Sequence, residues 1–191
     1  MYITHSYIGT NRGEVDYLIF YLTEEYIEEQ VNFTQQIQPM LNYLGEHLLN
    51  KGAVVQSFKN KIGQNNEELL QKWKKIFEED QYSRRLYNDV DRPALLIINT
   101  EINNLTKDNF LLISLRDFEE NGNFNIYEIK EFFQTLIEIV HSDIDLIEQT
   151  KKNIKRKNLK DTKTIMNINP SLFGVGINGK EAMKAFKKFI S

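Results

Sequence analysis

Three short apolar runs place the strongest constraint on the fold of this chain. They are EVDYLIFYL at residues 14–22, ALLIIN at 94–99 and NFLLISL at 109–115. Runs of this length, rich in β-branched and aromatic residues, are typical of strands buried in a sheet. None of them approaches the roughly 20 apolar residues of a membrane-spanning helix. The runs therefore predict a small sheet, and a short helix stays open as the alternative for 109–115.

The segments between these runs have the period of amphipathic helices. Apolar residues recur at helical spacing over 27–48, 66–77 and 126–147, and we expect a helix in each. Pro39 predicts a kink in the first helix and Gly52 predicts its end, while the third helix is expected to continue as far as Lys157. Since 191 residues suffice for one core but not for two ordinary ones, we expect one helix-rich α+β domain.

Charge is distributed unevenly along the chain. From residue 151 onward, eleven basic and two acidic residues give +9, so the preceding residues carry −12 within the total of −3. This divides the chain into an acidic body, residues 1–166, and a C-terminal part, residues 167–191, with a glycine-containing segment and a short basic amphipathic helix. The asymmetry predicts that this basic tail packs on its own body or on a partner.

The segment DFEENGNFNIYE, residues 117–128, has the spacing of a calcium-binding loop. Calcium prefers several oxygen ligands on a tight loop, with glycine at position 6 and glutamate at position 12, which here are Gly122 and Glu128. The segment resembles an EF-hand loop. That resemblance implies these ligands: Asp117, Glu119, Asn121, Asn123 through its carbonyl, and Glu128. If 109–115 is a strand, the same residues form a polar strand-to-helix connection in which an asparagine caps the helix.

A glycine pattern near the C-terminus is incomplete. Gly174, Gly176 and Gly179 match the G-x-G-x-x-G of dinucleotide-binding folds, but the twelve residues after Gly179 cannot complete that unit. We interpret residues 170–178 as an extended segment or hairpin that packs on the body, with a modest anion site at Gly179 and Lys180 as the alternative.

One histidine lies among carboxylates at helical spacing. His141 shares a predicted helix face with Glu138 and Asp145, which is half of a di-iron motif whose other half the sequence lacks. We therefore interpret His141 as a boundary residue of the core rather than a metal ligand.

The basic C-terminal region supplies the candidate residues for contact with a partner. Clustered lysines attract acidic surfaces, and aromatic residues between them add apolar contact. We predict a protein partner, with a nucleic acid or an anionic membrane surface as alternatives. The residues are Lys151, Lys152, Lys155, Arg156, Lys157, Phe173, Lys184, Phe186, Lys187 and Phe189.

These patterns favour a non-catalytic interaction or adaptor subunit of a multi-protein system, such as a bacterial or phage-related defence system. The chain has no cysteine and its first residues lack the pattern of a secretion signal, so we expect it in the cytoplasm and without a cofactor. A calcium-binding protein that uses 117–128 is the alternative. The third hypothesis is an enzyme with a composite carboxylate site, in which residues such as Asp89, Asp91 and Glu101 converge.

Overall fold

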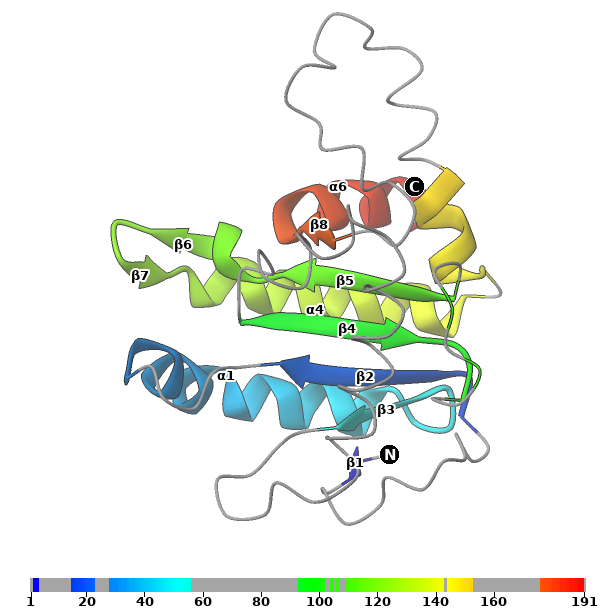
Figure 1. Ribbon diagram of the computed structural model, residues 1–191, viewed down its shortest axis with the longest axis horizontal. Coiled ribbons are helices and arrows are strands. Elements are labelled where there is room, and N and C mark those ends of the chain that lie inside the picture. Colours follow the sequence, from blue (N-terminus) through cyan, green and yellow to red (C-terminus); the bar gives the residue numbers. More distant parts are fainter. Residues whose placement is uncertain are drawn as a thin grey trace, which may run out of the picture.

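A mixed six-stranded sheet with the strand order β1-β3-β2-β4-β5-β8 forms the centre of the fold (Figure 1). The computed structural model describes residues 2–3, 15–22, 28–55, 93–101, 104, 106, 109–142, 144–152 and 176–190. The strands are β1 (Tyr2–Ile3), β2 (Tyr17–Leu22), β3 (Gly52–Val55), β4 (Ala94–Ile98), β5 (Phe110–Ser114) and β8 (Gly176–Asn178). The three apolar runs thus become β2, β4 and β5, and 109–115 is a strand rather than a helix.

Strand β4 runs against β2 and β5, whereas β1, β3 and β2 are parallel, as are β5 and β8. Because Leu22 pairs with Ala94 and Ala94 with Ser114, the carboxyl ends of β2 and β5 lie at the same edge of the sheet. From that edge the chain leaves β2 through α1 (Glu28–His47) toward β3 on one side. It leaves β5 through α4 (Ile126–His141) toward β8 on the other side.

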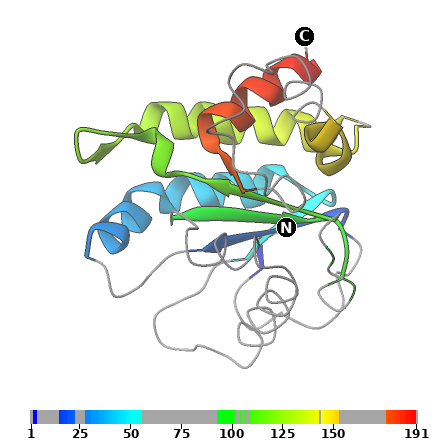
Figure 2. The same ribbon diagram turned by 45° about the horizontal axis from the view of Figure 1, so that its top comes forward.

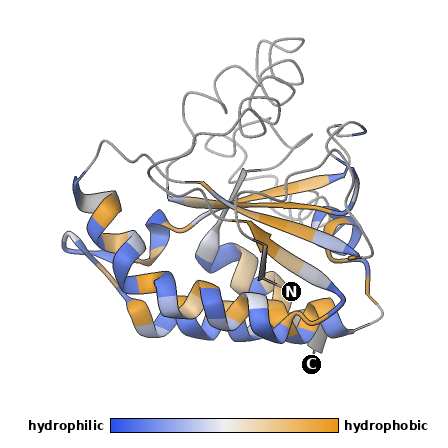
Figure 3. Cartoon of the chain, turned by 90° about the horizontal axis from the view of Figure 1, so that it is seen from below, coloured by the Kyte–Doolittle hydropathy of each residue, from blue (hydrophilic) through white to orange (hydrophobic). Residues whose placement is uncertain are grey.

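The helices α1, α4 and α6 (Gly179–Ile190) form a layer on one face of the sheet, as Figures 2 and 3 show. Helix α1 continues through Pro39, which lies on its exposed side. It ends at His47, and Gly52, predicted to end the helix, is instead the first residue of β3. Residues 48–51 make the connection, and within it Leu49 has a left-handed backbone with φ 51°.

The continuous helix predicted from residue 126 to Lys157 is wrong, because the chain turns after α4. The backbone N–H of Ser142 donates to carbonyls of the last turn of α4, at 3.1 and 3.0 Å. A new helical segment, residues 146–152, then begins behind Asp145, whose carboxylate accepts a hydrogen bond from Glu148 N at 2.9 Å. Aspartate is a strong N-cap, and this local preference interrupts an apolar period that continues through the turn.

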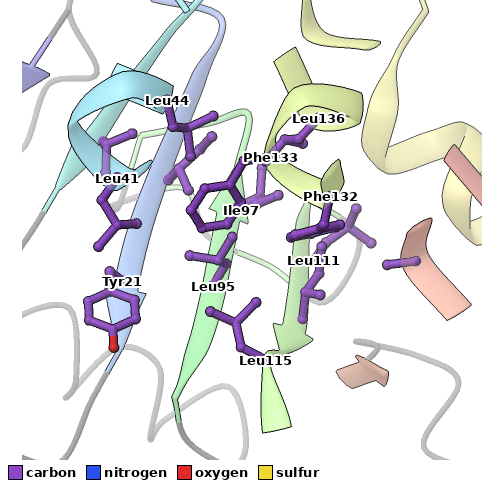
Figure 4. Packing of buried hydrophobic residues seen from close by; sticks show 14 of the residues in the cluster. Tyr21, Leu41, Leu44, Leu95, Ile97, Leu111, Leu115, Phe132, Phe133 and Leu136 are labelled. Carbon is purple, nitrogen blue, oxygen red and sulfur yellow. The ribbon is translucent and has the colours of Figure 1, made fainter. Parts of the chain in front are cut away.

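Alternating residues of the strands are buried on both faces of the sheet. In β2, Tyr17, Ile19 and Tyr21 pack toward the helices, whereas Leu18 and Phe20 belong to a second cluster on the opposite face. Figure 4 shows how side chains of α1 and α4 interdigitate with those of β4 and β5 on the helix side. Labelled there are Tyr21, Leu41, Leu44, Leu95, Ile97, Leu111, Leu115, Phe132, Phe133 and Leu136. Burial on both faces explains why the strands read as continuous apolar runs.

Helix α6 belongs to the same core as the rest of the helix layer. Ala182 and Phe186 are fully buried, and the Phe186 ring stacks on Phe132 of α4 with 5.9 Å between centroids. Phe132 in turn lies 5.6 Å from the ring of Phe118, just after β5. These rings connect the C-terminal helix to α4 and to the end of β5, so that α6 helps to position both.

The architecture confirms the predicted α+β class, with helices on one face of a mixed sheet. The helix predicted for 66–77 lies outside the described residues. Within the part of the chain that the structure describes, no helix combines the length and the apolar character that a membrane crossing demands.

Removing the Phe186 ring tests whether α6 is part of the core. We expect Phe186→Ala to lower the free energy of unfolding by about 3–5 kcal/mol, because the ring leaves a cavity beside Phe132. The exposed Lys184 on the same helix is the control, and Lys184→Ala should change stability by less than about 0.5 kcal/mol. Urea unfolding measures both, and equal small effects would show that α6 contributes little to the core.

Candidate functional site

The connection from β5 to α4 folds as a short helical turn followed by a hairpin. The turn η3 (Arg116–Phe118) leads into β6 (Glu119–Glu120), which pairs with β7 (Asn123–Phe124). Asn121 and Gly122 form the turn between the two strands, with φ of 54° and 78°. An Asn-Gly pair with positive φ at both residues is the most favoured two-residue hairpin turn. The sequence therefore contained a hairpin signal that the calcium-loop interpretation passed over.

One backbone hydrogen bond and one side-chain hydrogen bond, both made by Asn125, hold this connection at the start of α4. The Asn125 N–H donates to Phe118 O at 2.6 Å, so the chain after β7 returns to the end of η3. The Asn125 side chain accepts a hydrogen bond from Glu128 N at 3.2 Å and caps α4. An asparagine thus caps the helix that follows the strand, the arrangement expected for a polar strand-to-helix connection.

The first turn of α6 binds carboxylates of this connection. The Gly179 N–H donates to Asp117 Oδ2 at 3.3 Å, so the positive end of the helix holds an anion that belongs to the protein itself. A side chain at residue 179 would not fit, since a Cβ there would lie 2.7 Å from Ser114 O and closer still to the Phe118 ring. Gly179 is thus needed for close packing, and not for the dinucleotide motif whose spacing it matches.

The Lys180 ammonium lies between two carboxylates. Its Nζ donates to Glu120 Oε1 at 2.9 Å and lies 3.1 Å from the buried Glu128 Oε2, an ion pair without good hydrogen-bond geometry. The hydrogen bond to Glu120, followed by the contact with Glu128, raises the pKa of Lys180 above 10.5. Lys180 therefore ties α6 to both the hairpin and α4, and it holds a positive charge where the two carboxylates meet.

The residues predicted to bind calcium are divided among different contacts. Asp117 holds the start of α6, Glu119 lies 3.6 Å from Arg116 Nε, and Glu128 pairs with Lys180. Asn121 is in the hairpin turn, and Asn123 is in β7 with its side chain directed to the Asn121 carbonyl at 3.4 Å. Calcium binding by 117–128 stays a prediction, and an ion there would have to compete with Lys180 and with the Gly179 N–H for its ligands.

A polar groove opens on the other side of the hairpin, at the carboxyl ends of β2 and β5. Its volume is about 200 Å³, and the first turns of α1, the Arg116–Glu119 pair and β7 form its walls. Figures 1 and 2 both place the hairpin and the start of α1 at this end of the molecule. Phe124 of β7 stacks on Phe33 of α1 with 3.7 Å between ring centroids, which gives the groove an apolar floor. No sequence motif pointed to this groove, because its walls come from segments far apart in the chain.

The opposite end of α1 carries a small exposed patch of Tyr43, His47, Leu49 and His141, which we call the α1-end patch. The His47 ring stacks on Tyr43, and its Nδ1–H donates to Tyr43 O at 2.9 Å. The Nε2–H of His141, at the end of α4, donates to His47 O at 2.7 Å. The His141 imidazole thus satisfies the His47 carbonyl at the C-terminal end of α1, where a helix lacks internal donors, and the His47 imidazole bonds to a carbonyl one turn earlier in the helix. Within the patch Leu49 is 62% exposed and Tyr43 38%.

The basic residues predicted to contact a partner take different positions. Phe186 lies in the core, and Lys187 Nζ bonds to Glu131 Oε1 of α4 at 2.5 Å. Lys151 is half-buried, with its Nζ 5.8 Å from the centre of the Phe110 ring. Lys152 and Lys184 are exposed, and Lys152 pairs with Glu148 one turn away. Lys155, Arg156, Lys157 and Phe173 lie outside the described residues, and for Phe189 only the backbone, in α6, is described.

The other predicted constellations are not assembled among the residues that the structure describes. Asp145 caps the segment that follows α4, and His141 donates to His47, so the pattern of His141, Glu138 and Asp145 serves local structure. Glu101 is half-buried after β4, while Asp89 and Asp91 lie outside the described residues. Across the described ranges, no three carboxylate or imidazole groups gather closely enough to hold a metal ion.

No protein-family model, curated protein or solved structure matches this chain significantly.

The pH dependence of stability tests the role of Lys180. We expect Lys180→Met to lower the melting temperature, because it removes the cation between Glu120 and Glu128. Since the folded-state pKa is raised, this stabilisation is complete below pH 10.5 and is lost as the pH rises through the folded pKa. The difference from wild type should thus be constant from about pH 8 to about pH 10 and shrink as the pH rises above 10.5.

Thermal melts over this pH range measure the effect. The exposed Lys130 of α4 serves as control, and Lys130→Met should leave the melting temperature nearly unchanged at every pH. A Lys180→Met difference that persists undiminished above the lysine pKa would mean that the lost charge is not its cause.

Proposed function

We propose that this chain is a non-catalytic interaction subunit of a multi-protein system in the cytoplasm, and that a protein partner docks on the α1-end patch. The observation that carries the proposal is the conformation and exposure of Leu49. Its backbone is left-handed, with φ 51°, and its side chain is 62% exposed. The patch lies where α1 and α4 end together, on elements packed against the sheet.

Leucine is an unfavourable residue at this position for the fold alone. A left-handed backbone costs a residue with a Cβ about 1–2 kcal/mol, which glycine avoids and asparagine tolerates. At 62% exposure the leucine side chain also forgoes a large part of the roughly 1.5–3 kcal/mol that full burial contributes. Either glycine or asparagine would make the turn into β3 without these costs. Burial of Leu49 by a partner would recover the free energy that its exposure forgoes. The left-handed backbone points the same way, because strained residues cluster at functional positions.

The neighbours of Leu49 have the chemistry of a protein interface. Tyrosine is among the residues that contribute most to binding at interfaces, and Tyr43 is held in place by its stack on His47. His141 fixes the end of α4 to the end of α1 through its bond to His47 O. Side chains on rigid elements lose little conformational entropy on binding, which favours affinity.

Only some of the basic C-terminal residues have a charge that is available to a partner. Of the lysines on α6, Lys180 and Lys187 are paired with carboxylates of the body, which leaves less charge for a partner. Lys184 is exposed on the same helix and retains its charge for long-range attraction of an acidic partner. The contribution of these charges should appear as salt dependence of binding, whereas burial of Leu49 should not depend strongly on salt.

The substitution Leu49→Asn separates binding from folding. We expect it to leave stability unchanged or to raise it by up to about 1 kcal/mol, because asparagine relieves the left-handed strain. The same substitution should strongly reduce the amount of partner that co-purifies with the tagged chain from its own host. Urea unfolding and quantitative mass spectrometry of the purified complex measure the two effects.

Tyr127 provides a matched control, because it is 78% exposed in the first turn of α4, at the opposite end of that helix from His141. Tyr127→Ser should leave the co-purified partner unchanged. If Leu49→Asn destabilises the fold, Leu49 has a structural role, and if it leaves the partner bound, the patch is not the docking surface.

A further inference from the structure

The groove beside the hairpin brings together residues from three separate parts of the chain. It opens at the edge of the sheet where β2 and β5 end and β4 begins, and its walls come from α1, from Pro93 and from the connection after β5. The chemistry of these walls indicates which class of ligand the groove can bind.

The walls of the groove carry one positive charge, one negative charge and three carboxamides. Arg116 Nε lies 3.6 Å from Glu119 Oε2, too far for a hydrogen bond, and the two side chains are 41% and 28% exposed. Both charged groups therefore retain hydrogen-bonding capacity toward the groove. Asn32 and Gln36, one turn apart on α1, each add a donor and an acceptor, and Asn123 of β7 adds a third carboxamide, whose nitrogen also donates to the Asn121 carbonyl.

We propose that this groove binds a free α-amino acid in its zwitterionic form. The ligand's carboxylate accepts hydrogen bonds from the Arg116 guanidinium, and its ammonium group donates to the Glu119 carboxylate. In an α-amino acid these two groups are roughly 3 Å apart, as bond lengths require, which matches the 3.6 Å between Arg116 Nε and Glu119 Oε2. The carboxamides of Asn32, Gln36 and Asn123 then face the ligand's side chain and favour a polar one.

Size and charge favour a small ligand that carries both charges. About 200 Å³ holds roughly seven water molecules, hence roughly seven to ten non-hydrogen atoms of a ligand. This is smaller than the roughly 300–1,000 Å³ of pockets that enclose drug-sized ligands. A simple anion would meet Glu119 and a simple cation would meet Arg116, whereas a zwitterion satisfies both at once.

The frame of the groove is held by contacts outside it. Leu115 N donates to Pro93 O at 2.8 Å, which fixes the end of β5 against the start of β4. Lys180 anchors Glu120, the hairpin residue next to Glu119. Because the walls are tied in this way, a ligand would find them already in place, which reduces the entropic cost of binding.

Thermal shift with each of the twenty L-amino acids at about 10 mM tests the proposal, since a ligand that binds only the folded chain raises its melting temperature. We expect one or a few polar amino acids to bind, and L-glutamine is the example for which the analogues are named. Analogues that lack one of the two charged groups should not raise the melting temperature. For L-glutamine these are glutaramate, without the ammonium group, and 4-aminobutanamide, without the carboxylate.

Titration calorimetry of the variants then locates the site. Arg116→Gln and Glu119→Gln should each weaken binding at least about tenfold, because each leaves one charge of the ligand unpaired. Lys130→Gln makes the same charge change as Arg116→Gln on the exposed face of α4 and should have no effect. Melting of each variant without ligand verifies that it is folded.

Three results would overturn the proposal: no amino acid binds, the single-charge analogues bind as well as the amino acid, or binding survives both groove substitutions. The test is independent of the α1-end patch, because Asn32 and Gln36 are in the first half of α1, whereas Tyr43 is near its end and Leu49 follows it. Loss of the partner in Leu49→Asn should leave amino acid binding intact.

Discussion

The rings of Phe118, Phe132 and Phe186 connect the parts of this fold that the chain order separates. Phe132 on α4 contacts both of the others, which come from the end of β5 and from α6 near the C-terminus. Large aromatic side chains bury more apolar area than other residues, so this row is a major part of the described contact between α6 and the rest of the helix layer. With Phe118 held there, η3 and the hairpin behind it take a defined position, and the groove follows from that position.

Ion pairs between α6 and the body add to this apolar contact and favour one placement of the helix. The acidic body and the basic C-terminal part meet through Lys180 with Glu120 and Glu128, through Lys187 with Glu131, and through Asp117 at the start of α6. Exposed ion pairs of this kind contribute little stability individually. Their effect is to favour one placement of α6 over others, since a different register would leave carboxylates of the connection without cations.

The two ends of α1 have different chemistry. Its first turns present carboxamides to a groove with a paired arginine and glutamate, and the stacked rings of Tyr43 and His47 near its other end are followed by the exposed Leu49. The helix rises about 1.5 Å per residue, so Asn32 and His47 are roughly 22 Å apart along its axis. We infer a ligand at the first end and a protein partner at the second, on opposite ends of one rigid element.

The sequence by itself determined the elements whose signals are local. The apolar runs of β2, β4 and β5, the period of α4 and the cap at Asn125 depend on neighbouring residues, and they appear in the structure where the chain predicts them. The signal for the Asn121–Gly122 turn was equally local, but the segment was interpreted as a calcium-binding loop because of the oxygen-bearing residues around the turn. Asp145, too, marked a helix start that the continuing apolar period concealed.

The tertiary structure alone decided the features that join distant segments. Strand order, the parallel pairing of β8 with β5, and the approach of Gly179 to Asp117 bring together residues more than fifty positions apart. The groove and the left-handed turn at Leu49 likewise depend on where α1, the hairpin and β3 are placed by packing. Side-chain period specifies which face of an element is buried, but it carries no information on which other element covers that face. That choice depends on how the whole set of apolar surfaces is buried together.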